Sequence, residues 1–175
     1  MELAEYLSAA RLTRILLLLG LGLIAIYAEA APLGLSATAH PSPDLLLCLI
    51  AYWSLRRPGS TPMLAVFALG LGRDLLTDVP VGAGALSLVI VAEVLKAWRA
   101  PIARAVFPLE WAAVAFAALA SAGMQWLLVV VTLAQPPYLM ALIHQSLFTA
   151  LVYPLIVIFL RWGLRITWRK REAVA

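Results

Sequence analysis

Three charged side chains, Arg73, Asp74 and Asp78, lie close together in an otherwise apolar stretch that runs from Gly70 to Gly82. Ionisable residues are costly to bury in a membrane, and they are therefore candidates for function wherever they occur inside one. Side chains of these types at this spacing can bind a solute or an ion, tie helices together, or contact a partner protein. The elements around them decide between these roles.

The composition is that of an integral membrane protein. Of 175 residues, 64% are hydrophobic and 13% are charged, and the mean hydropathy is +0.97. Soluble domains are nearer one half apolar and one quarter charged. Short loops join the apolar segments, so we expect a single multi-pass membrane domain over residues 1–175 without a soluble enzyme domain. The single cysteine, Cys48, excludes a disulfide within the chain.

Six apolar segments are predicted to be membrane-spanning helices. They cover residues 12–31, 43–56, 62–79, 84–98, 110–134 and 138–161. A helix of about 20 residues crosses a hydrocarbon core about 30 Å thick. The second segment is short for a crossing, so it must be shielded by its neighbours, thin the bilayer or recruit loop residues. Asp44 precedes its apolar run and is predicted to cap the helix N-terminus.

The positions of the basic residues predict the orientation. With the N-terminus placed in the cytoplasm, twelve of the thirteen Lys and Arg residues fall on the cytoplasmic side, and the remaining one is Arg73. This distribution follows the positive-inside rule and predicts an all-α bundle of six transmembrane helices with cytoplasmic N and C termini. Orientation and contact with anionic membrane lipids explain the net charge of +4, which excludes nucleic acid as a partner. Tyr52 and Trp53 fit an aromatic belt at the membrane surface.

Arg73 is the basic side chain that the orientation leaves unexplained, so it needs a partner within the membrane. Asp74 and Asp78 share one helix face, whereas Arg73 points about a quarter-turn away. Counted from the outer loop at about 1.5 Å per residue, Arg73 and Glu93 lie at depths of about 9 and 15 Å. We therefore predict an Arg73–Glu93 ion pair between neighbouring spans, with Glu29 as the second possible partner. Asp78 belongs at the outer rim and Asp74 inside the bundle.

The sequence contains no pattern typical of catalysis. There is no Ser/His/Asp order, no HExxH helix and no glycine-rich phosphate loop with a lysine. His144 has no second histidine or cysteine nearby that would complete a metal site. We therefore expect a protein that is not an enzyme and that needs no cofactor and no metal.

One motif resembles a known family. The pattern is Gly-x-x-x-Asp-Leu-Leu-x-x-x-Pro-x-Gly, and its residues are Gly70, Asp74, Leu75, Leu76, Pro80 and Gly82. Together with the segments 43–47 (PDLLL) and 52–56 (YWSLR), and with the overall length, it resembles the rod shape-determining protein MreD family of bacteria. Two residues depart from the family pattern: Arg73 before the aspartate, and Asp78, where a glycine or another small residue is expected.

The resemblance implies a non-enzymatic, multi-pass protein of the bacterial cytoplasmic (inner) membrane that belongs to the cell-elongation machinery. The implied partners are an MreC-like bitopic protein and, through it, an MreB-like filament and a glycan polymerase–transpeptidase pair that makes peptidoglycan. Such a protein acts as a scaffold that maintains rod shape. The six-span arrangement is also similar to the substrate-binding subunits of energy-coupling-factor transporters. The alternative function is therefore a solute-binding transporter subunit in which Arg73, Asp74 and Glu93 line a cavity.

Overall fold

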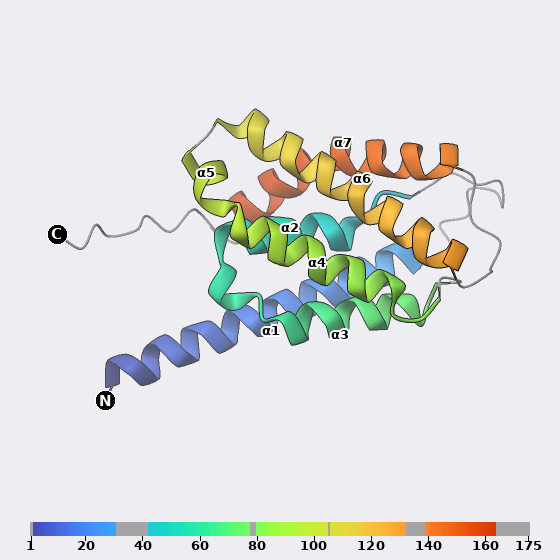
Figure 1. Ribbon diagram of the computed structural model, residues 1–175. Coiled ribbons are helices and arrows are strands. Elements are labelled where there is room, and N and C mark those ends of the chain that lie inside the picture. The colour runs from blue at the N-terminus through green and yellow to red at the C-terminus, as the bar shows by residue number, and fades with distance from the viewer. Residues whose placement is uncertain (1, 31–41, 78–79, 105, 132–138, 164–175) are drawn as a thin grey trace.

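The computed structural model describes residues 2–30, 42–77, 80–104, 106–131 and 139–163, and these residues form helices and turns without a strand. The elements are α1 (Glu2–Ala30), α2 (Leu45–Arg56), the 3₁₀ turn η1 (Pro58–Ser60), α3 (Met63–Asp74), α4 (Ala83–Ala97), α5 (Arg99–Arg104), α6 (Phe107–Val131) and α7 (Leu139–Gly163). The long helices run roughly along one common direction, as Figure 1 shows. The predicted all-helical class is confirmed for the described residues.

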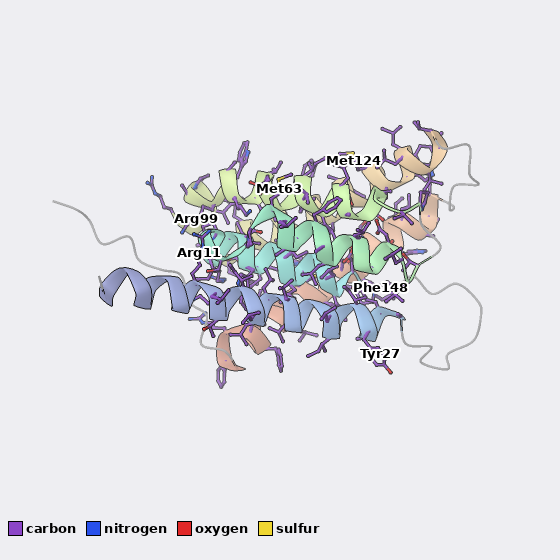
Figure 2. All side chains as sticks on the ribbon, turned by 90° about the horizontal axis from the view of Figure 1, so that it is seen from below. Arg11, Tyr27, Met63, Arg99, Met124 and Phe148 are labelled. Carbon is purple, nitrogen blue, oxygen red and sulfur yellow. The ribbon has the colours of Figure 1, made fainter. Side chains whose placement is uncertain are left out.

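Among the described residues, three helices are long and apolar enough to cross a membrane. They are the segments Arg11–Ala30, Phe107–Val131 and Leu139–Trp162, with mean hydropathies of 1.8, 2.0 and 1.9. The N-terminal end of α1 and the C-terminal end of α7 lie at the same end of the bundle (Figure 1). Figure 2 shows Arg11 and Arg99 at that end and Tyr27 at the other. The count of six spans and the cytoplasmic location of both termini stay predictions.

Helix α2 forms the centre of the bundle. Every residue of α2 after Leu45 is buried, because α1, α4 and α7 pack around it. Tyr52 and Trp53 are both 0% exposed, so the predicted place for them in a surface aromatic belt is wrong. With 12 residues, α2 is about 18 Å long at about 1.5 Å per residue. Of the three ways in which a short helix can be accommodated, the structure uses shielding by neighbours.

Helix α3 ends earlier than the sequence predicts. The predicted segment reached residue 79, whereas α3 ends at Asp74 and the chain then turns. The Leu76 N–H bonds to the Arg73 carbonyl at 2.9 Å, and the Thr77 hydroxyl donates to the same carbonyl at 3.1 Å, which tightens this last turn. Asp78 lies outside the described residues, so its predicted place at the outer rim stays a prediction.

Candidate functional site

The motif begins where α3 and α4 touch through their backbones. A Cβ atom built on Gly70 would lie 2.5 Å from the Ala85 Cα atom, which is closer than real Cβ atoms approach. Glycine at this position therefore allows the two helices to pack more closely than any side chain would. The first motif residue thus sets the spacing between α3 and α4.

Asp74 joins α3 to the beginning of α4. It is 2% exposed, and its Oδ2 atom accepts hydrogen bonds from the Gly82 N–H at 2.9 Å and the Ala85 N–H at 3.0 Å. The first N–H groups of a helix lack partners within the helix, and they carry a partial positive charge that a carboxylate stabilises. Asp74 therefore caps α4 from the neighbouring helix. The prediction that Asp74 lies inside the bundle is confirmed.

The other motif residues shape the turn that brings α4 to Asp74. The Ala83 N–H bonds to the Pro80 carbonyl at 3.0 Å, and Gly82 has φ +97°, a left-handed conformation that glycine adopts without strain. Gly84, which lies outside the motif, is packed just as tightly, because a Cβ atom there would collide with the Asp74 carboxylate. Gly70, Asp74, Pro80 and Gly82 therefore define one α3–α4 hairpin.

The predicted Arg73–Glu93 pair is wrong. The Arg73 side chain is 9% exposed, and its Nη1 atom lies 2.7 Å from Oδ2 of Asp44. Glu93 is an exposed residue whose carboxylate pairs with Lys96 on its own helix at 2.8 Å. The depth of Glu93 suited the predicted pair, but Glu93 lies on the face of α4 that points away from the other helices, whereas Ala92 and Leu95 point inward.

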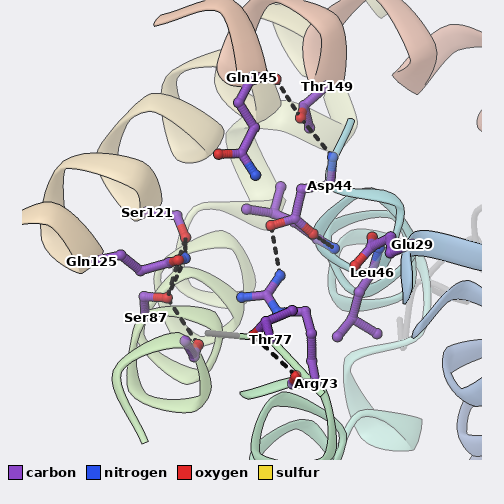
Figure 3. A network of polar contacts seen from close by, with 12 residues as sticks. Glu29, Asp44, Leu46, Arg73, Thr77, Ser87, Ser121, Gln125, Gln145 and Thr149 are labelled. Atoms are coloured by element: carbon purple, nitrogen blue, oxygen red, sulfur yellow. Dashed lines mark hydrogen bonds and ion pairs between the residues drawn. The ribbon is translucent and has the colours of Figure 1, made fainter. Parts of the chain in front are cut away.

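Two carboxylates meet the N-terminus of α2, as Figure 3 shows. Asp44 accepts the Leu47 N–H at 2.7 Å, which confirms its predicted role as the N-cap. Glu29, from the end of α1, accepts the Leu46 N–H at 2.9 Å through Oε1. Glu29 therefore lies near Arg73 but binds the backbone of α2 instead. We call Glu29, Asp44, Arg73 and Asp74 the charged cluster.

Helices α6 and α7 are attached to the same region by neutral polar groups (Figure 3). The Asp44 N–H donates to the Thr149 hydroxyl at 2.9 Å, and that hydroxyl donates to the Gln145 carbonyl at 2.7 Å. Gln125 of α6 donates from Nε2 to Ser87 of α4 at 3.1 Å. The charged cluster and these neighbours therefore connect all six of the longer helices.

The cavity that the described residues form beside the charged cluster is very small. A cavity lined by Asp44, Gln125, Gln145, Thr149 and their neighbours has a volume of about 10 Å³. That volume corresponds to about one water molecule, whereas small-molecule sites measure about 300–1,000 Å³. The geometry of this region suits holding helices together, with at most a bridging water between them.

A second buried ion pair lies at the opposite end of α2, and sequence reasoning missed it. Arg56 donates from Nη2 to both carboxylate oxygens of Glu110, at 2.9 and 3.1 Å, and the Tyr153 hydroxyl donates to Glu110 at 2.7 Å. The Arg56 guanidinium also stacks on the Tyr52 ring, 4.7 Å from its centroid. The sequence does contain one indication of this ion pair. Glu110 begins the fifth apolar segment on the predicted cytoplasmic side, which is also the side of Arg56.

Comparison with known proteins does not assign the chain to a family. No protein-family model matches the sequence, and neither a curated protein nor a solved structure matches it. Within the described residues, no group of three or more His, Cys, Asp or Glu side chains is arranged to hold a metal ion. The fold and the charged cluster define a class: an all-helical bundle that contains helices of membrane-spanning length and ties its helices together with buried charges.

Proposed function

We propose that this chain is a non-enzymatic scaffold in the bacterial cytoplasmic membrane and a component of the cell-elongation machinery that maintains rod shape. In this proposal it crosses the membrane six times with both termini in the cytoplasm. Its direct partner is an MreC-like bitopic protein, which connects it to an MreB-like filament and to the glycan polymerase–transpeptidase pair. The assignment to this machinery rests on the resemblance carried by the Gly70–Gly82 motif.

The observation that favours a scaffold is that the side chains of the charged cluster bind other parts of the same bundle. Asp74 caps α4, Asp44 and Glu29 bind the N-terminus of α2, and Arg73 neutralises Asp44. A transporter subunit that binds a solute through these charges needs a cavity beside them, and the cavity that the described residues form there measures about 10 Å³. A scaffold needs instead a fixed arrangement of helices that presents a constant surface. The geometry therefore favours the scaffold over the solute-binding alternative.

The motif also has an outward-facing part. Leu75 and Leu76, which follow the buried Asp74, are 68% and 63% exposed, and Val81 across the turn is 63% exposed. The hairpin thus holds three apolar side chains outward at one end of the bundle while Gly70 and Asp74 fix it from inside. We propose these three side chains as the contact surface for the membrane helix of the bitopic partner.

The proposal is tested in the bacterium that carries this protein. The chromosomal gene is replaced by the Leu75→Ala/Leu76→Ala variant or by a control, Leu151→Ala/Leu155→Ala, which shortens two equally exposed leucines on α7 (55% and 65% exposed). Cell shape is measured by microscopy, and the MreC-like protein is quantified after purification in mild detergent. We expect rounded cells and reduced recovery of the partner for the first variant, at unchanged abundance in the membrane.

Three results would contradict the scaffold. One is wild-type shape and partner recovery in the Leu75→Ala/Leu76→Ala strain. Another is an equal loss of rod shape and of partner recovery in the Leu75→Ala/Leu76→Ala strain and in the control strain. The effect would then come from a general weakening of the apolar surface. The third is purification of the wild-type protein with a tightly bound solute and an ATPase pair, which would establish the transporter alternative.

A further inference from the structure

A large apolar groove lies away from the charged cluster, between α4, α5 and α6. Its volume is about 460 Å³, within the range of small-molecule sites. Its walls include Ile90, Val94 and Trp98 from α4 and its end, and Leu109 and Phe116 from α6. The only polar group among the side chains that line it is the indole N–H of Trp98, so the groove suits a hydrocarbon occupant.

The length of the groove matches one leaflet of a bilayer. Its lining runs from Ile90 to Trp98 along α4 and from Leu109 to Ala120 along α6. At about 1.5 Å per residue these stretches measure about 12 and 16 Å. The hydrocarbon core of a membrane is about 30 Å thick, so one leaflet contributes about 15 Å. A transmembrane helix of a partner would need a surface about twice as long.

Two arginines belong to α5, the helix that also contributes Pro101 and Ile102 to the lining of the groove. They are Arg99 and Arg104. Arg56, Arg73 and Lys96 each pair with a carboxylate, whereas in the described part of the chain Arg99 and Arg104 form no ion pair. Trp98 is 65% exposed beside them, a position typical of tryptophan at the level of lipid headgroups.

We propose that this groove binds one acyl chain of an anionic phospholipid, with the headgroup phosphate held by Arg99 and Arg104. The groove is about 12–16 Å long, which is the length of one acyl chain within a leaflet about 15 Å thick. The occupant comes from the leaflet on the side of α5, where the headgroup reaches the two arginines. This site is independent of the partners proposed above.

Native mass spectrometry of the full chain in mild detergent tests the proposal. The probes are phosphatidylglycerol and phosphatidylcholine with identical acyl chains, added in a titration. We expect one molecule of phosphatidylglycerol to bind at least about tenfold more tightly than phosphatidylcholine. Ala120→Phe fills the groove from an exposed position and is expected to weaken phosphatidylglycerol binding at least about tenfold. Ala112→Phe adds the same ring to an exposed position outside the groove and is expected to leave binding unchanged.

The headgroup contacts are tested separately. Arg99→Gln/Arg104→Gln is expected to remove the preference for phosphatidylglycerol while leaving phosphatidylcholine binding intact. The matched control Arg11→Gln/Arg14→Gln removes two cations from α1 and is expected to keep the preference. The proposal is overturned if the wild type shows no preference, or if Ala120→Phe binds lipid as the wild type does. It is also overturned if Ala112→Phe weakens phosphatidylglycerol binding as much as Ala120→Phe does. The same holds if Arg11→Gln/Arg14→Gln loses as much of the preference as Arg99→Gln/Arg104→Gln does.

Discussion

Replacing Asp74 by alanine tests directly whether the charged cluster holds the bundle together. The substitution removes the acceptor of two N–H bonds, from Gly82 and Ala85, at a site where the side chain is almost completely buried. Loss of an N-cap costs about 0.5–2 kcal/mol, and one hydrogen bond to a charged group contributes about 1.5–3 kcal/mol. We therefore expect Asp74→Ala to lower the free energy of unfolding by about 2–4 kcal/mol.

Replacing Asp74 by asparagine separates the contribution of the hydrogen bonds to stability from that of the negative charge. Both bonds go to the same carboxylate oxygen of Asp74, Oδ2, so the amide oxygen of an asparagine side chain in the same place can accept both. Asp74→Asn then keeps both hydrogen bonds and loses the negative charge, whose interaction with the N-terminus of α4 contributes about 0.3–1 kcal/mol. We expect Asp74→Asn to retain most of the stability that Asp74→Ala loses.

The assay is equilibrium unfolding by SDS in mixed micelles, followed by tryptophan fluorescence. Glu93→Ala is the control, because it removes an exposed carboxylate whose ion pair with Lys96 is worth less than about 1 kcal/mol. The role assigned to Asp74 is refuted if Asp74→Ala unfolds together with the wild type. It is also refuted if Asp74→Asn is destabilised as much as Asp74→Ala, because capping by the shared oxygen atom would then not be the cause.

Three other experiments give independent tests. Gly70→Ala is expected to cost about 1–3 kcal/mol in the same unfolding assay, because its Cβ meets the Ala85 backbone, whereas Gly72→Ala has open space and should not destabilise the protein. Glu110→Ala leaves a buried guanidinium without its carboxylate and should cost about 3–5 kcal/mol, measured in the same way. A cysteine at Thr77, which is exposed in the α3–α4 turn outside the proposed contact surface, should react with an impermeant maleimide on intact spheroplasts. A cysteine at Gly59 should react only after permeabilisation, and the opposite pattern would overturn the proposed orientation.

The sequence is informative wherever structure depends on near neighbours along the chain. Asp44 directly precedes an apolar run, so its role as N-cap could be predicted, and so could the helices and the burial of Asp74. The partner of Arg73 could not be predicted, because counting residues gives the depth of a side chain but not the direction in which it points. Glu93 has a suitable depth and the wrong direction. Asp44 is 29 positions before Arg73, and only the packing of α2 beside α3 brings the two together.

The central position of α2 explains why the bundle contains buried charges at all. In the proposed membrane, a helix about 18 Å long ends well inside a hydrocarbon core about 30 Å thick. Its terminal N–H groups then lack water, and each unsatisfied group costs several kcal/mol, on the order of 2–7 kcal/mol. Glu29 and Asp44 accept the N–H groups of Leu46 and Leu47, and these carboxylates in turn require the nearby positive charge of Arg73. Arg73, which departs from the family pattern, is therefore accounted for by the short helix that it helps to stabilise.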